Sequence, residues 1–269
     1  MVLVKAGAWK KGRPNGTALR TKIQAFYIDK YEATNEAYYR FTSATHRPTP
    51  PFPAPGAAVF RWVNGRYPSG RGRCPVVLVS FEDAAAFADW AGKKLPTQEQ
   101  WEYAARGTQC GEFPWGNSKL PPADCNTADR LAGRELFGDD MWQEWYNEWA
   151  KQEPAKRNAE ALKPVGSFPK DVSRFGCFDL GGNVSEWCVK TAENDHINGF
   201  DSEYRADAVV TNGHVACGGS WLKPAGATRA WCYDALESAQ YYDVGFRCVV
   251  PAGNLAVQAL AQTAEIAAK

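Results

Sequence analysis

The sequence predicts one loop-rich globular domain in which short strands and helices surround an aromatic core. The 269 residues include eleven Trp, 24 Gly and 17 Pro, a composition that favours irregular connections and large buried rings. Apolar segments are short, and their spacing alternates between strand-like and helix-like. No internal repeat or hinge-like linker divides the chain, so we expect a single domain over residues 1–250 and a tail over residues 251–269.

Overall charge and hydropathy argue against two classes of partner. The chain carries 31 basic and 30 acidic residues, a formal net charge of +1, and so lacks the positive charge typical of nucleic-acid-binding proteins. No apolar run approaches the roughly 18 residues that a membrane-spanning helix needs. We therefore expect no nucleic-acid partner and no membrane insertion.

The N-terminal part of the chain alternates strand and helix signals. Residues 2–4 and 25–28 predict two strands, the second rich in aromatic and β-branched side chains. Thr34 is placed to cap a short helix over residues 35–42. Proline and glycine then crowd residues 46–72, which predicts a long irregular surface loop.

Two capped helices are predicted next. Ser80 is placed to cap a helix over residues 82–92, whose apolar side chains recur at helical spacing. Thr97 and Gln100 form a capping box that begins a second helix, which runs through Ala105.

The second half of the chain is less periodic. Residues 110–190 predict loop with brief strands, apart from a helix over residues 139–151. Its Trp142, Trp145 and Trp149 share one face, which favours a stripe packed on the core over a ligand platform. Strand signals return at residues 209–211, 215–217 and 245–250. The Ala- and Gln-rich tail predicts a terminal helix outside the core.

The eight cysteines bear on the compartment. They are Cys74, Cys110, Cys125, Cys177, Cys188, Cys217, Cys232 and Cys248. None forms a C-x-x-C pair, which argues against a zinc ribbon or a thioredoxin-type motif. Their even number favours an exported protein with several disulfides over a cytosolic protein with buried thiols. We therefore expect a periplasmic or secreted protein. No signal peptide is visible, so an exported protein would be present here in its mature form with an added Met.

Six short motifs carry a family resemblance. In chain order they are KLPTQEQWEYAARG (94–107), FPWGN (113–117), PVGSFP (164–169), FDLGGNVSEW (178–187), GGSW (218–221) and GFRC (245–248). In this order they resemble the formylglycine-generating enzyme, or sulfatase-modifying factor, family over roughly residues 1–250. The resemblance implies an irregular, loop-rich α+β single domain of the C-type-lectin type. Because this scaffold hosts oxidases and plain binding modules alike, the fold does not settle the function.

The resemblance fails at the family's copper site. Family enzymes oxidise a substrate cysteine with copper held by two cysteines between the GGS and GFR motifs, where soft thiolates suit Cu(I). Here Lys223 stands at the first of these positions, and only Cys232 remains in that stretch. We therefore expect no copper and no copper-dependent formylglycine generation. Ser185 also replaces the family's Trp in the N-x-W-E-W motif, whereas Ser220 matches its active-site serine.

The resemblance also bears on the other cysteines and on the histidines. Cys248 lies where the family has a structural disulfide cysteine, and Cys110 is its nearest plausible partner. A disulfide between Cys217 and Cys232 is favoured over a metal-binding pair. A related branch of sulfoxide synthases binds iron through clustered histidines, but the three histidines here are widely separated, and we expect them to be unrelated.

Structural calcium is the cofactor that the resemblance implies. The positions that match one family site are the Asp179 side chain, the Gly182 and Val184 carbonyls and the Glu186 side chain. A second site would use Asn126, the Thr127 carbonyl, Asp140 and the Trp142 carbonyl, although the flanking sequence has diverged. Oxygen donors at such spacing suit Ca²⁺, and the alternative is a polar turn without an ion.

Residues 229–243 match the stretch that lines the binding face of this fold. Rings alternate there with charged side chains, a combination that stacks on and hydrogen-bonds to a polar ligand. The catalytic candidates are Glu237 and Asp234 as general bases and the neighbouring Ser220. The substrate-binding candidates are Lys223, which could hold an anion, and Arg229, Trp231, Tyr233, Tyr241 and Tyr242. The alternative for each acid is a solvated loop carboxylate.

Two functions follow from this resemblance. The first is an exported enzyme that works without the copper cysteines on a peptide-type substrate, as in the branch of the family that acts in oxidative maturation of the siderophore pyoverdine. The second is a non-catalytic lectin-like module that binds a ligand, such as the variable protein of a diversity-generating retroelement or an accessory binding domain. A structural domain with a vestigial groove is a weaker third possibility.

Overall fold

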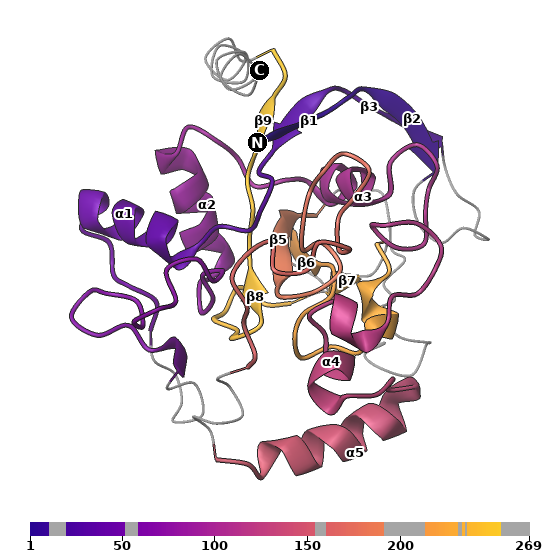
Figure 1. Cartoon of the computed structure of the whole chain (residues 1–269). Helices are drawn as coiled ribbons and strands as arrows, with labels where there is room; N and C mark the ends of the chain where they lie inside the picture. Colours follow the sequence, from indigo (N-terminus) through magenta and orange to yellow (C-terminus); the bar gives the residue numbers. More distant parts are fainter. Residues whose placement is uncertain are drawn as a thin grey trace.

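The computed structural model describes residues 1–10, 20–51, 59–153, 160–190, 213–230, 233–234 and 236–253 (Figure 1). Short strands and helices alternate with long irregular connections, as the composition predicts. In the described part of the chain, no helix has both the length and the apolar character needed to cross a membrane.

One small sheet joins the two ends of the domain. Strand β4 (Phe26–Ile28) lies between β1 (Val2–Val4) and β9 (Val249–Pro251), and both pairings are antiparallel. Strands β2 (Gly7–Lys10) and β3 (Arg20–Ile23) form a separate two-stranded ribbon that continues beyond β1 and arches over α3 (Figure 1).

The central sheet is the element that positions the candidate site. Its strand order is β7 (Tyr233–Asp234), β6 (His214–Cys217), β5 (Ser185–Val189) and β8 (Val244–Gly245). The β5–β8 pair is parallel and the other two are antiparallel. Three segments that lie far apart in the sequence therefore meet at one sheet: the SEW motif, the strand before GGS and the residues before GFR.

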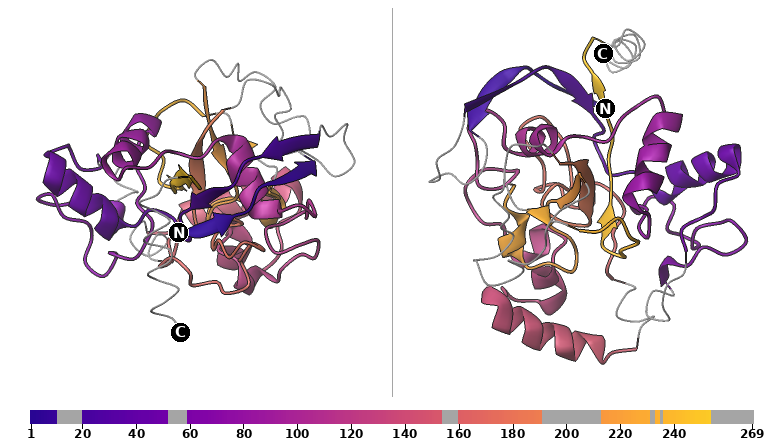
Figure 2. Two further views of the ribbon diagram at one scale, coloured as in Figure 1. Left: turned by 90° about the horizontal axis from the view of Figure 1, so that it is seen from above. Right: turned by 180° about the vertical axis from the view of Figure 1, so that it is seen from behind.

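The helices surround this sheet. Helices α1 (Asn35–Thr45) and α2 (Phe81–Trp90) lie together at one side, and α4 (Ala128–Ala132) and α5 (Gly138–Ala150) lie at another (Figures 1 and 2). Helix α3 (Gln98–Arg106) packs on β5 and β6. Two 3₁₀ turns, η2 (Pro122–Asp124) and η3 (Ala225–Thr228), complete the set.

Local side-chain chemistry explains where α2 and α3 begin. The Ser80 hydroxyl accepts the Asp83 N–H, and the Asp83 carboxylate accepts the Ser80 N–H. Thr97 and Gln100 make the same reciprocal pair of bonds. Both capping boxes satisfy backbone N–H groups that have no partner inside the helix. The predicted caps are confirmed.

Aromatic side chains fill the core, as the composition predicts. Trp9, Trp101, Trp187 and Trp221 are among the largest fully buried side chains. On α5, Trp149 is buried and its ring lies 5.5 Å from that of Trp221, so the predicted inward-facing stripe is confirmed at its C-terminal end.

Several predicted elements differ from the structure or lie outside its description. The strand predicted over residues 245–250 is divided into β8 and β9, because Arg247 leaves the ladder to bond buried carbonyls and Glu186. The short helix α4 was not predicted, since five residues give no readable period. The predicted strand 209–211 and the tail from residue 254 lie outside the described residues.

The predicted disulfide between Cys110 and Cys248 is wrong. All seven cysteines in the described part of the chain are free thiols. Cys110 accepts the Lys10 N–H at 3.2 Å, whereas Cys248 is buried and its backbone N–H bonds Asp29. Cys217 is also a free thiol, and Cys232 lies outside the described residues. The aromatic core therefore holds this part of the fold without these bridges.

Candidate functional site

Lys223 and Ser185, the two positions at which the sequence departs from the family motifs, are in contact. The Lys223 ammonium donates a hydrogen bond to the Ser185 hydroxyl at 2.7 Å, although 38 residues separate them. The same ammonium lies 3.4 Å from the Gly218 carbonyl oxygen. Ser185 in turn donates to the Gly218 and Gly219 carbonyls. The small hydroxyl residue at the start of β5 thus gives the Lys223 side chain an acceptor beside the GGS turn.

Asp234 completes the surroundings of Lys223. Strand β7 pairs Asp234 with Ala216 of β6, which brings its carboxylate to 2.5 Å from the Lys223 ammonium. The Lys223 side chain is 19% exposed and that of Asp234 is 37% exposed, so this pair is partly open to solvent. Asp234, predicted as a general base, is therefore the counter-ion of Lys223.

Ser220 forms a second polar pair with Asp243. Its buried hydroxyl donates to the Asp243 carboxylate at 2.8 Å and accepts the Leu222 N–H. The Asp243 carbonyl accepts the Ser185 N–H, which fixes Asp243 beside β5. Burial raises the pKa of Asp243, as does the charge of Asp234, while Lys223 and the Ser220 hydrogen bond lower it.

Asp243 is a site residue that the sequence reasoning did not single out. The available signal was its position two residues before the GFR motif, inside the stretch already assigned to the binding face. Its contact with Ser220 spans 23 residues and depends on the parallel pairing of β5 with β8.

The loop that carries Glu237 is tied to the neighbouring scaffold. The Glu237 side chain is exposed, and its carbonyl accepts a hydrogen bond from the Tyr241 hydroxyl. Ser238 accepts the Phe81 N–H and donates to Glu82, which joins the loop to the start of α2. The structure therefore does not bring Glu237 into the Lys223 and Ser220 contacts.

The remaining substrate-binding candidates have different surroundings. The half-buried Tyr241 and Tyr242 pack against Trp187 and Trp221, with ring centroids 6.1 and 5.9 Å apart. Arg229 pairs with Glu112 at 2.7 Å. Tyr233 lies on β7, and Trp231 lies outside the described residues. Their roles in substrate binding stay predictions.

A second ionic centre, formed by Arg247 and Glu186, is fully buried. Arg247 bonds both oxygens of Glu186 at 2.7 Å, and Trp101 donates to the same carboxylate at 2.8 Å. Both charged side chains are 0% exposed. The arrangement is a bidentate, charge-assisted pair of the kind that needs full hydrogen bonding to offset burial.

Further buried carboxylates surround this centre. Burial raises the pKa of Asp171 to about 7 and that of Asp179 to about 6. The pKa of Glu32 is raised well above its usual range by burial and by the charges of Asp179 and Glu186. These side chains bond backbone N–H groups, including Gly181 to Asp171 and Val184 to Glu32.

The first predicted calcium set does not fit an ion as it stands. Glu186 gives both oxygens to Arg247, and Asp179 accepts the Gly166 N–H at 2.6 Å. The Val184 and Gly182 carbonyls lie on the same turn, but Ca²⁺ takes six to eight oxygen donors, and the Glu186 and Asp179 oxygens already accept these N–H groups.

The second predicted calcium set is also engaged elsewhere. The Asn126 side-chain oxygen accepts from Arg130 at 2.8 Å, and its amide donates to Asn183. Asp140 is exposed in the first turn of α5, while the Trp142 ring nitrogen bonds the Leu222 carbonyl. In the part of the chain that the structure describes, no group of three or more His, Cys, Asp or Glu is arranged for a metal.

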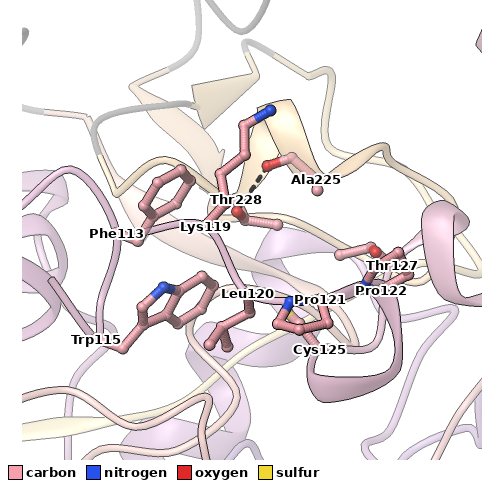
Figure 3. Close-up of a pocket in the computed structure, with 10 residues that line it drawn as sticks. All are labelled: Phe113, Trp115, Lys119, Leu120, Pro121, Pro122, Cys125, Thr127, Ala225 and Thr228. Carbon is pink, nitrogen blue, oxygen red and sulfur yellow. Dashed lines mark hydrogen bonds between the residues drawn. The ribbon is translucent and has the colours of Figure 1, made fainter. Parts of the chain in front are cut away.

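A small cavity lies beside the groove, next to η3 (Figure 3). The rings of Phe113 and Trp115 stack on one side with centroids 5.3 Å apart, and Thr127 and Pro122 lie on the other. The cavity volume is about 10 Å³, room for about one water molecule. Its Thr127 hydroxyl is buried and has no hydrogen-bond partner. The cavity is too small to define the site.

Fold and site together define a class: an irregular α+β domain of C-type-lectin type with a partly exposed Lys–Asp pair and a buried Arg–Glu pair. Over residues 1–252 the chain matches the family described as sulfatase-modifying factor enzyme 1-like domain. It belongs to that family, as the six motifs predict.

Named relatives place the chain within the family. It is 32% identical over 206 residues to a formylglycine-generating enzyme of Mycobacterium tuberculosis, covering 61% of this chain and 63% of that protein. It is 36% identical over 134 residues to the inactive C-alpha-formylglycine-generating enzyme 2 of Mus musculus, covering 47% and 37%. Both alignments therefore span less than two thirds of the relative.

A solved structure supports the fold over nearly the whole chain. PvdO from Pseudomonas aeruginosa matches with a TM-score of 0.62, covers 92% of both chains and is 24% identical. At this identity the likeness establishes the lectin-type fold and leaves the chemistry to the residues of the groove.

Proposed function

We propose that this chain is an exported enzyme of the family that works without a copper cysteine pair. Its proposed role is the oxidative maturation of a peptide-type substrate, such as the siderophore pyoverdine. The proposal goes beyond the family assignment, which by itself covers active and inactive proteins alike.

The observation that carries the proposal is the Lys223–Ser185 contact. At the position where the family places a copper ligand, a cation bonds the hydroxyl that replaces the motif's Trp. Lys is an ammonium donor and offers no soft ligand to Cu(I). The remaining groove holds a serine, two carboxylates and a cation, which suits proton transfer and binding of a polar substrate.

The test is conversion of the reduced pyoverdine precursor by the purified protein, followed by absorbance and mass spectrometry. We expect the wild type to oxidise the precursor and Lys223→Met to lose most of that activity while keeping its fold. Glu237→Ala tests the predicted base on the exposed loop and should also block conversion. Lack of conversion by the wild type in the presence of dioxygen would sink the proposed function.

Copper content separates this proposal from the family's best-known reaction. We expect the active protein to retain activity after copper chelation. Stoichiometric copper in the purified protein, together with activity that returns only when copper is added back, would show that the copper-free assignment is wrong.

The compartment and the partners remain part of the proposal. The even cysteine count first favoured the periplasm or the exterior, with a peptide or peptide siderophore as substrate. Cell fractionation of the native host, followed by detection of the protein in each fraction, tests the compartment. Protein found only in the cytoplasm would contradict it.

A second function is favoured by the neutralised charge of the groove. Because Lys223 is already paired with Asp234, the groove could hold a ligand without transforming it. The relative named inactive in Mus musculus shows that the family includes non-catalytic members. Binding of the precursor without any conversion would support this ligand-binding module over the enzyme.

A further inference from the structure

The ion pair between Lys223 and Asp234 joins two partners of unequal freedom. The Lys223 ammonium donates to the hydroxyl of Ser185, which is fully buried, and lies near the Gly218 carbonyl oxygen. Asp234 approaches the same ammonium at 2.5 Å with a side chain that is 37% exposed. Of these acceptors, only the Asp234 carboxylate can turn into solvent without breaking a buried contact.

Replacing the Asp234 carboxylate on Lys223 with another carboxylate should change the electrostatic free energy little. Ion pairs at the protein surface add little to stability, and the Asp234 side chain is 37% exposed, so releasing its carboxylate to water costs little. An incoming carboxylate restores the charge that leaves, and the neighbouring Asp243 then sees the same balance as before. An incoming cation would instead have to compete with Lys223 itself, which is held by Ser185 and Gly218.

Asp243 cannot take the place of Asp234. Its carboxylate accepts from the buried Ser220 hydroxyl, and its carbonyl accepts the Ser185 N–H. It is thereby fixed in place, near enough to Lys223 for the two groups to interact electrostatically. Among the described residues, Lys223 thus has a fixed carboxyl group, Asp243, and an exchangeable carboxylate, Asp234, as neighbours.

We propose that Asp234 is an internal placeholder in a carboxylate-binding site, and that substrate binds by placing its own carboxylate on Lys223. This assigns Asp234 to substrate admission instead of to the role of general base. The inference deepens the proposed function, because it names a carboxylate-bearing peptide as the substrate class for the same groove. No bond is made or broken in this step.

Acetate and a short acidic peptide are the probes, since neither needs to be transformed. Binding is followed by NMR titration of the full-length protein, with the Lys223 side-chain ammonium as the site-resolved signal. We expect Asp234→Asn to bind acetate roughly fivefold more tightly than the wild type, because about 1 kcal/mol of internal competition is removed. Lys223→Met should remove the binding.

Glu135→Gln is the matched control, because it removes one exposed carboxylate that pairs with Lys119 and leaves the Lys223 pair intact. We expect its affinity for acetate to stay within twofold of wild type. If Glu135→Gln tightens binding as much as Asp234→Asn, the effect is one of net charge and the placeholder role is wrong. Absence of Lys223-dependent acetate binding in Asp234→Asn also overturns it.

The acetate titration tests the carboxylate site, and the conversion assay tests the enzymatic function, so either result can be negative without the other. Acetate binding at Lys223 without precursor conversion would leave the carboxylate site standing and remove the enzymatic function. Conversion of the precursor with no acetate binding in Asp234→Asn would leave the enzyme standing and remove the carboxylate site.

Discussion

Two ion pairs in this domain have similar chemistry and opposite settings. The Arg247–Glu186 pair is fully buried, bidentate and supported by the Trp101 ring nitrogen. The Lys223–Asp234 pair is partly exposed, and only its cation is tied to the buried scaffold. Burial commits the first pair to the fold, whereas exposure leaves the second able to exchange partners.

The two pairs also differ in how they relate to the family motifs. Glu186 and Arg247 lie within the SEW and GFR motifs, and both match the family pattern. Lys223 stands where the family has a copper cysteine. The chain therefore keeps the charges that hold the scaffold and changes those that face the groove.

Breaking the buried Arg247–Glu186 pair should have the largest effect on the free energy of unfolding. We expect Arg247→Met to lower the free energy of unfolding by about 3–5 kcal/mol, because Glu186 is left as a buried, uncompensated charge. Urea denaturation followed by tryptophan fluorescence measures this. Arg229→Met, which breaks the partly exposed pair with Glu112, is the control and should cost about 1 kcal/mol or less. Equal losses of stability in the two variants would show that burial does not distinguish the two kinds of ion pair.

The carboxylates around the buried pair predict the next largest effect, a dependence on pH. Burial raises the pKa of Asp171 to about 7 in the folded protein, against about 3.9 when unfolded. The folded state therefore binds more protons between these values, and Asp171 destabilises it increasingly as the pH rises from about 4 to about 7.

We therefore expect Asp171→Asn to flatten the loss of stability with rising pH, by up to about 1.4 kcal/mol per pH unit in this window. Chemical denaturation at several pH values from acid to mildly alkaline gives the slope. A slope in the variant equal to that of the wild type would show that Asp171 carries no such shift. Above pH 7 the two curves should run parallel.

Added calcium should have the smallest effect on stability. Because Glu186 is engaged by Arg247 and Asn126 by Arg130, we expect Ca²⁺ added after chelation to leave the unfolding midpoint nearly unchanged. Thermal unfolding followed by circular dichroism measures the shift. A clear rise that Asp179→Asn abolishes would establish the calcium site implied by the resemblance, and would mean that Glu186 can leave Arg247.

Features that depend on neighbours in the chain were predictable from the sequence. The caps at Ser80 and Thr97 need only residues three positions apart, and the six motifs identify the family over residues 1–252. The absence of a copper cysteine at Lys223 could also be read directly. Local sequence signals did not predict the break between β8 and β9. This break lies at Arg247, whose side chain bonds Glu186, and the two residues are 61 positions apart in the chain.

Contacts between distant segments were decided only by the tertiary structure. Sequence spacing could not show that Lys223 bonds Ser185, that Ser220 bonds Asp243, or that Glu237 lies on an exposed loop. It also could not show that Cys110 and Cys248 stay apart as free thiols. By itself the sequence determined the scaffold, because motifs and caps are local. The central sheet decided which charges meet, because hydrogen bonds between strands join residues that are far apart in the chain.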